Sequence, residues 1–261
     1  MYIAQTDSTN NFLQRTMQEH DNLFKDIDSI AYVYTFDQTA GRGQAGNHWE
    51  ATAGQNLLFS YLLRANNSYE ATALPKPERL FDLNMMASLA LYRTVVKLLT
   101  ADNVQHLTIK WPNDLYYQDK KLAGILVENT LQGASIAYSI TGIGLNVHQT
   151  IWHDGAPNPI SLTQITGAQY DMHNLMADFM HELHALIGSS DLREQYLQHL
   201  YRREGMHQYM EREVSTAPTT LAQGSGFWAA FCDITPQGEL VLRLADNTIK
   251  KYHFKQIRYI L

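Results

Sequence analysis

The residues best suited to chemistry lie in a short glycine-rich loop near the N-terminus. The segment Gly41–Gly46 reads Gly-Arg-Gly-Gln-Ala-Gly, which matches the pattern G-x-G-x-x-G. In a dinucleotide-binding domain this pattern is followed by a helix whose N-terminus holds the pyrophosphate. Here the apolar run Leu57–Leu63 follows, and its composition is typical of a strand. The sequence therefore argues against a dinucleotide-binding domain.

Two interpretations of the glycine loop remain once a kinase or Walker A phosphate loop is excluded. Protein kinases also place a glycine loop between strands, but the chain has no V-A-I-K, H-R-D or D-F-G motif and no Walker A motif. The loop is then either a mobile segment that closes over a bound anion or a plain surface turn. For the first interpretation, glycine N–H groups and the Arg42 guanidinium can bind phosphate or carboxylate oxygens. Trp49 would cover such a site and exclude water.

Composition bounds the class of protein. The chain has 261 residues, 45% of them hydrophobic, which suits one large domain and a small one. A net charge of −6 disfavours non-specific nucleic-acid binding. The single cysteine, Cys232, allows no intrachain disulfide, and no signal peptide is recognised, so a reducing cytoplasm is expected. No apolar run approaches the ~20 residues of a membrane helix, so no membrane partner is expected.

Histidines suggest a metal site only weakly. His181 and His184 are one helical turn apart, and His199 and His207 follow. The chain has neither an H-E-x-x-H motif nor a pair of cysteines. We interpret these residues as surface histidines on helices.

Hydrophobic periodicity predicts an α+β region with a mixed or antiparallel sheet and packed helices. Helices are expected after an N-cap at Asp7, Ser8 or Thr9, and over a stretch containing Leu89 to Leu99. Further helices are expected over Asp171–Ile187 and Leu192–Tyr201. Strands are expected at Ile30–Phe36 and Leu57–Leu63, and in an antiparallel meander marked by alternation at 107–111, 122–128 and 136–140. Pro112 should end the first strand of the meander, which leaves Asn113 and Asp114 at the end of that strand.

A second unit is expected at the C-terminus. Thr216–Gly226 has the small and polar residues of a linker, and four short strand patterns follow, at Phe227–Ile234, Glu239–Leu244, Ile249–His253 and Gln256–Ile260. Four strands in so short a segment favour a small barrel. We therefore expect a catalytic domain at residues 1–215 and a β-barrel at 216–261.

Five motifs, taken in order, carry a family resemblance. They are Asp7–Asn10, Gln38–Gly43, Lys110–Leu115 (KWPNDL), Lys121–Glu128 (KLAGILVE) and Gly142–Val147 (GIGLNV). On these motifs the chain resembles the biotin–protein ligases. Because the Ser8–Thr9 motif begins at once, we expect the short form of the family, which lacks an N-terminal DNA-binding domain. The resemblance implies a class II synthetase-like, biotin–lipoate ligase fold with an SH3-like terminal barrel.

The family's activity follows from the resemblance. Its members activate biotin with ATP and Mg²⁺ to biotinyl-5′-AMP and transfer biotin to a lysine of a biotin carboxyl carrier protein domain, such as that of acetyl-CoA carboxylase. DNA is not an expected partner of the short form. A ureido ring needs donors and acceptors in a dry pocket, where each unpaired group costs ~1–3 kcal/mol.

The resemblance also assigns site residues. The implied catalytic residues are Lys121, Arg42 and Asp114, with Asp114 either holding Mg²⁺ or taking the proton of the incoming lysine. The implied biotin-binding residues are Ser8, Thr9, Asn10, Gln38, Gly41, Arg42, Gly43, Gln44, Lys121 and Gly124, and the implied nucleotide-binding residues are Trp49, Lys110, Asn113 and Asn146. Helix capping is the plain alternative for Ser8 and Thr9, and a solvated hairpin lysine for Lys121.

The chain departs from the family at one place and leaves rivals open. Many members carry more arginines in the glycine loop, where this chain has Gln44, Ala45 and Asn47. A lipoate–protein ligase would use the same adenylation chemistry on a related fold. A biotin-binding sensor without transfer activity would need no phosphate site, and a biotin-sensing repressor would need a DNA-binding domain.

Overall fold

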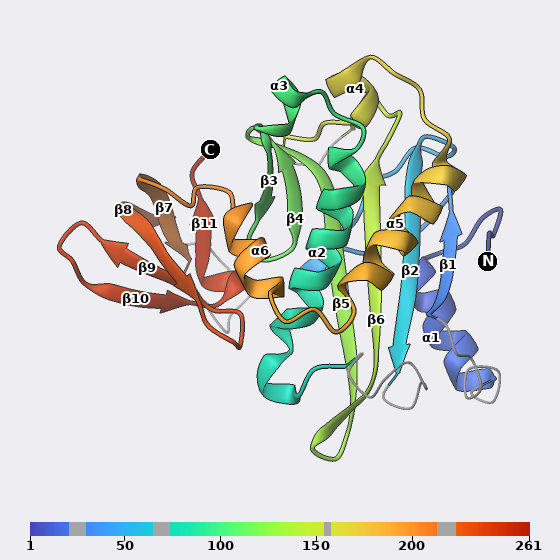
Figure 1. Cartoon of the computed structure of the whole chain (residues 1–261), viewed down its shortest axis with the longest axis horizontal. Helices are drawn as coiled ribbons and strands as arrows, with labels where there is room; N and C mark the ends of the chain where they lie inside the picture. Colours follow the sequence, from blue (N-terminus) through green and yellow to red (C-terminus); the bar gives the residue numbers. More distant parts are fainter. Residues whose placement is uncertain (21–29, 65–73, 154–157, 213–222) are drawn as a thin grey trace.

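The computed structural model describes residues 1–20, 30–64, 74–153, 158–212 and 223–261. Figure 1 shows a large sheet with helices on it and a smaller sheet beside it. The large sheet has the order β1-β2-β6-β5-β4-β3, and every neighbouring pair is antiparallel. Its strands are β1 Ala31–Thr35, β2 Asn56–Arg64, β3 Leu107–Lys110, β4 Asp114–Tyr117, β5 Lys120–Gln132 and β6 Ser135–Asn146.

The expected meander is confirmed, with one strand more than predicted. β3 ends at Lys110, before Pro112, as the missing N–H of proline requires. The chain then reverses within three residues, and Asp114 pairs with Lys110 as the first residue of β4. The prediction that Asn113 and Asp114 end a strand was therefore wrong for Asp114, because four residues were too short to show a periodic pattern.

Helices cover one face of the large sheet. α2 Phe81–Val96 and α5 Met172–Leu186 pack against each other, and Figure 1 shows both lying across the sheet. Phe179 of α5 packs on Phe59 of β2 with ring centroids 4.7 Å apart. The shorter helices are α3 Ala101–Val104, α4 Leu162–Thr166 and α6 Leu192–Gln198. α3 and α4 were not predicted, because so few residues carry little periodicity.

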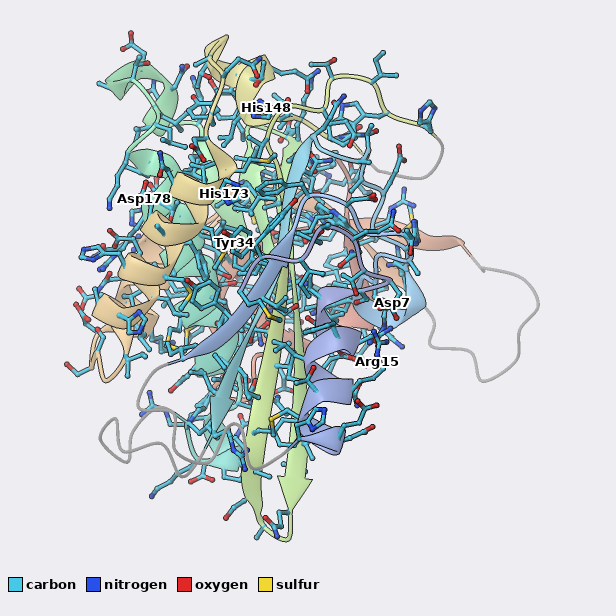
Figure 2. The ribbon with its side chains drawn as sticks, turned by 90° about the vertical axis from the view of Figure 1, so that its right-hand side faces the viewer. Asp7, Arg15, Tyr34, His148, His173 and Asp178 are labelled. Atoms are coloured by element: carbon cyan, nitrogen blue, oxygen red, sulfur yellow. The ribbon has the colours of Figure 1, made fainter. Side chains whose placement is uncertain are left out.

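The opposite face of the sheet is covered by α1 Thr9–Glu19. Leu13 and Met17 lie one turn apart and pack on Val33, Leu62 and Ile140. Ser8 occupies the N-cap position, but its side chain makes no capping hydrogen bond. Asp7 binds Arg15 instead, at 2.8 Å through both carboxylate oxygens, as the labelled pair in Figure 2 illustrates. The Arg15 guanidinium holds the pKa of the Asp7 carboxyl well below its usual range.

The glycine loop is followed by the strand β2, as predicted. A single 3₁₀ turn, Gln44–Gly46, lies inside it. The loop folds back on itself, because Gly43 N–H donates to Asn47 at 2.7 Å and Trp49 N–H donates to Gly41 at 3.0 Å. A Cβ at Gly41 would lie 2.4 Å from the Trp49 carbonyl oxygen, so this close approach needs glycine.

The C-terminal unit is a five-stranded antiparallel sheet of order β10-β9-β8-β7-β11. Its strands are β7 Met206–Arg212, β8 Gln223–Ile234, β9 Leu240–Leu244, β10 Ile249–Tyr252 and β11 Ile257–Tyr259. The four predicted strands are present. β7 was not predicted. Because β7 pairs with β8, this sheet contains residues from both sides of the expected boundary between residues 215 and 216. Most of the expected linker, residues 216–222, lies outside the described residues.

One continuous core joins the two sheets. It runs from Phe59 and Leu89 in the large unit to Leu242 and Tyr259 in the small one. Trp111 donates its indole N–H to the Gly238 carbonyl at 2.9 Å across the junction. The position of the small sheet is therefore fixed by packing rather than by a linker alone. The division of the chain into domains stays a prediction.

The histidines are only in part as expected. His181 and His184 lie exposed on α5. His199 follows α6 and stacks on Tyr92 with centroids 4.0 Å apart, and His207 lies on β7 rather than on a helix. Within the described ranges, no three His, Cys, Asp or Glu side chains are grouped to hold a metal ion. None of the helices in that part of the chain has the length and apolar character needed to cross a membrane.

Two glycines of β6 let other segments reach the sheet. A Cβ at Gly142 would lie 2.1 Å from Asn10 Oδ1, and a Cβ at Gly144 would lie 2.3 Å from Cε2 of Trp49. Asn10 is buried at the start of α1, whereas the Trp49 ring ends a side chain on a surface loop. The Trp49 ring can therefore move away from an added methyl group more easily than Asn10 can.

We predict that Gly142→Ala destabilises the fold more than Gly144→Ala. The added methyl at 142 displaces Asn10 from its buried hydrogen bonds and should lower the free energy of unfolding by about 1–3 kcal/mol. At 144 the indole can move away, so a smaller loss is expected. Urea unfolding of both variants measures the difference. Equal losses would mean that the start of α1 is as free to move as the loop.

Candidate functional site

The strand register lines up a row of residues across the large sheet. Lys110 pairs with Asp114, Asp114 with Gly124, and Gly124 with Gly144. Residues directly opposite on antiparallel strands point to the same face. This is the face of α1, since Gly142, two residues before Gly144, contacts Asn10. The row therefore sets a lysine and an aspartate beside two glycines, Gly124 and Gly144, which we call the glycine floor.

Lys121 joins this row from the start of β5. Its Nζ lies 2.7 Å from Asp114 Oδ1 and 5.5 Å from the centre of the Trp49 ring. Its backbone is held by Asn158 O at 2.7 Å and by Ile160 N–H at 3.0 Å. The side chain is 24% exposed, while the neighbouring Lys120 is fully on the surface. Lys121 is therefore a placed cation and not a solvated hairpin lysine.

A buried polar cluster lies where α1 meets the sheet. Gln38 Oε1 accepts from Thr9 N–H at 3.0 Å, and Ser60 Oγ lies 2.7 Å from Thr9 Oγ1 and 2.5 Å from Asn10 Oδ1. Ser8, Thr9 and Asn10 are at most 3% exposed. Helix capping does not explain the burial of Ser8, because its hydroxyl does not cap α1. Ser60 was missed from the sequence because it lies inside an apolar strand.

Glu128 is a second residue that sequence reasoning missed. It binds Arg42 with both oxygens, at 2.6 and 3.2 Å, and accepts from Asn10 Nδ2 at 2.8 Å. It thereby ties the glycine loop to β5 and α1. The signal was present, because Gly124, Leu126 and Glu128 alternate onto the site face and end in a charge.

The Trp49 indole lies directly on the glycine floor. A Cβ at Gly124 would be 2.8 Å from its Cζ3, and one at Gly144 would be 2.6 Å from its Nε1. Three buried polar atoms here have no hydrogen-bond partner among the described residues: Trp49 Nε1, Gln44 Oε1 and Asn146 Oδ1. Such atoms cost ~1–3 kcal/mol each when unpaired, so a ligand that paired with them at this place would gain from it.

The two asparagines expected at the nucleotide both hold the backbone. The Asn113 amide donates to the Ile125 carbonyl, and Ile125 N–H donates back to Asn113 O at 3.0 Å. Asn113 therefore clamps the β3–β4 turn to β5 through its backbone and its side-chain amide. Asn146 Nδ2 donates to Ile160 O at 3.1 Å and lies 3.3 Å from Lys121 O. Its contribution to the site is to fix Lys121 and to present the unpaired Oδ1.

Of the predicted site residues, most come together. Those on α1, the glycine loop, β4, β5 and β6 surround one stretch of the sheet face, while Lys110 closes the row at the strand next to the C-terminal sheet. The arrangement offers two cations, a carboxylate, close backbone approach and an aromatic cover. These are the elements needed to bring two anionic groups together away from water.

The sequence matches the model of the biotin/lipoate A/B protein ligase family over residues 2–146, more than half of the chain, so the chain belongs to this family. It is 31% identical over 207 residues to the bifunctional ligase/repressor BirA of Escherichia coli, covering 79% of this chain and 55% of that protein. It is 32% identical over 173 residues to the biotin–[acetyl-CoA-carboxylase] ligase of Paracoccus denitrificans, covering 65% of each.

The chain thus spans between 55% and 65% of the length of these curated relatives. Solved structures establish the fold over the full chain. The biotin protein ligase from Aquifex aeolicus in complex with biotin and ATP has a TM-score of 0.69 at 20% identity and covers 100% of this chain and 98% of that one. The biotin protein ligase from Leishmania major in complex with biotin has a TM-score of 0.62 at 21% identity, with 97% of each chain covered.

We predict that Glu128→Gln loosens the glycine loop. The variant keeps the shape of the side chain but removes the charge that holds Arg42, a partly exposed pair worth about 0.5–1 kcal/mol. Amide hydrogen exchange in residues 41–50 should then quicken about two- to fivefold. Glu211→Gln, which breaks a similar exposed pair with Lys250, should leave the loop unchanged. An unchanged loop in Glu128→Gln would show that other contacts hold it.

Proposed function

We propose that this chain is an ATP-dependent biotin–protein ligase that forms biotinyl-5′-AMP and transfers biotin to a lysine of a biotin carboxyl carrier protein domain. One observation carries the proposal: the Lys121 ammonium, 2.7 Å from Asp114, stands at the edge of a glycine floor roofed by Trp49. The family supports it, and so do relatives whose names are those of biotin ligases.

The first step joins two anions. A carboxylate oxygen of biotin attacks the α-phosphorus of ATP, the bond to the leaving oxygen breaks, and pyrophosphate departs. Lys121 is placed to offset the repulsion between carboxylate and phosphate and to stabilise the charge of the transition state. Arg42 can add a forked pair of donors once it leaves Glu128, because its guanidinium fits a carboxylate or a phosphate equally well.

The biotin ring requires a different environment. The proposed ureido pocket uses the buried hydroxyls of Ser8 and Thr9 and the amide of Gln38, with Asn10 and the glycine-loop residues Gly41, Gly43 and Gln44 around it. The burial of this cluster supports the assignment, since polar contacts discriminate best where water is excluded. Gln44 has a buried oxygen without a partner in the described chain, which suits a donor on a ligand.

The second step needs a neutral amine. A free lysine has a pKa of about 10.4, so the carrier lysine must lose a proton before it attacks the carbonyl of the mixed anhydride. AMP then leaves and an amide bond forms. Asp114 is the carboxylate of the row and can accept this proton.

Mg²⁺ fits the same position. Magnesium in nucleotide sites uses one or two carboxylates with phosphate oxygens and water, so a lone Asp114 meets its requirement even though no larger acidic group occurs among the described residues. When bound with ATP, the ion would neutralise phosphate charge, and Asp114 would hold it.

The rival functions are distinguished by the site. A lipoate–protein ligase shares the family and the adenylation step, but a dithiolane ring has no use for the polar cluster at α1. A sensor without transfer activity would not need the Lys121–Asp114 pair. DNA remains an unexpected partner and the cytoplasm the proposed location, both resting on sequence composition.

We predict that Lys121→Ala lowers pyrophosphate release from ATP and biotin by about a hundredfold or more, because one preorganised charge at a transition state has this value. The matched control is Lys120→Ala, which removes the exposed neighbouring lysine and should leave the rate near wild type. Both variants should keep their unfolding temperature within a few degrees. Wild-type rates in Lys121→Ala would remove Lys121 from the reaction.

Ligand choice tests the function directly. We expect biotin, and not lipoate, to raise the melting temperature, and ATP with Mg²⁺ to raise it further, because binding to the native state alone stabilises it. Incubation with biotin, ATP, Mg²⁺ and a carrier domain should add the mass of one biotinyl group to the carrier. Stabilisation and transfer with lipoate instead would assign the chain to the other branch of the family.

A further inference from the structure

Lys110 has an unusual environment for a cation at the end of the row. Its Nζ lies 4.7 Å from the centre of the Tyr116 ring and 4.8 Å from that of Tyr259. Tyr116 belongs to β4 of the large sheet, whereas Tyr259 belongs to β11 of the C-terminal sheet. In the part of the chain that the structure describes, Lys110 makes no ion pair, so two ring faces hold its charge.

The surrounding charges explain why rings are needed. Burial lowers the pKa of Lys110, and Asp114, its register partner, opposes this effect. Asp114 is already bound by Lys121 at 2.7 Å. The other charges that act on Lys110 are cationic: Lys121, Arg202 and Arg212. The quadrupoles of the two rings therefore compensate for the water that the buried ammonium has lost.

The Tyr259 ring is fixed by the C-terminal sheet. It is 8% exposed and packs on Tyr209, its strand partner, with centroids 5.1 Å apart, and on Tyr201 at 5.9 Å. The neighbouring Ile260 carbonyl accepts from Arg202 Nη2 at 2.8 Å, which anchors the strand end to the chain after α6. The face that Tyr259 offers to Lys110 thus depends on how the two sheets dock.

We propose that Tyr259 is a positioning residue for the adenylation site, acting through Lys110. By holding the ammonium between two rings, the C-terminal sheet sets a second positive charge beside Asp114 and Lys121. This charge acts on the phosphate groups that gather at the row. The inference rests on the proposed function, since it assigns the C-terminal sheet a part in the first step of that reaction.

The test compares variants that keep or remove the ring. Tyr259→Phe keeps the ring face and should retain the wild-type rate of biotin-dependent pyrophosphate release. Tyr259→Leu should lower kcat about tenfold, the equivalent of one desolvated cation–π contact, with little change in the KM for biotin. The control is Tyr252→Leu, which removes another buried tyrosine that stacks on Phe227 in the same sheet. It should lower stability but leave kcat near wild type.

A double variant asks whether the effect passes through Lys110. Lys110→Met should lower kcat, and adding Tyr259→Leu to it should cause little further loss, because both changes remove one interaction. In parallel, the NMR signals of the Lys110 side chain should show a ring-current shift that persists in Tyr259→Phe and decreases in Tyr259→Leu, where only the Tyr116 ring remains.

The outcomes separate the two proposals. Equal kcat losses in Tyr259→Leu and Tyr252→Leu, or losses that multiply in the double variant, would overturn the role of Tyr259 while leaving the ligase function intact. A wild-type chain that releases no pyrophosphate with biotin would overturn the proposed function and this inference with it.

Discussion

The register of β4, β5 and β6 is the constraint on which the rest of the site depends. It sets Asp114 opposite Gly124 and Gly124 opposite Gly144, so that a carboxylate stands beside a floor without side chains. A slip of one residue would turn this whole row to the face that α2 and α5 cover. The register is held by the apolar residues that alternate with the row, such as Ile125, Ile143 and Leu145, which are buried under α2 and α5. Burial of one face therefore positions the chemistry of the other.

Few charged side chains stand beside this floor. Lys121 binds the Asp114 carboxylate, whereas the ammonium of Lys110 lies over two aromatic rings. The arrangement leaves an excess of positive charge where two anionic substrates are proposed to meet. It also makes the small sheet part of the site, because one of the two rings is supplied by Tyr259 from β11. The continuous core between the sheets is consistent with a shared task.

The glycine loop is closed on the protein itself. Arg42 is bound by Glu128, and the Trp49 indole rests on the glycines that a ligand would contact. A ligand entering the floor must displace or carry the indole and must compete with Glu128 for Arg42. Both contacts are replaceable, since the ion pair is partly exposed and the indole N–H lacks a hydrogen-bond partner in the described structure. In the proposed reaction, substrate oxygens would replace Glu128 as partners of Arg42, which is what a cover needs in order to open and close.

The sequence by itself determined the order of the motifs, the exclusion of a helix after the glycine loop, the main strands and helices, and the family to which the chain belongs. These properties are local, because hydrophobic periodicity and short motifs are read within about a dozen residues. The tertiary structure decided which residues meet. Glu128 binds Arg42 from 86 positions away, Asn113 turns its amide to the backbone of β5, and Tyr259 reaches Lys110 from another sheet. Such pairings depend on strand register and on docking of the two sheets. Both depend on packing contacts throughout the core, so they cannot be predicted from any single segment of the sequence.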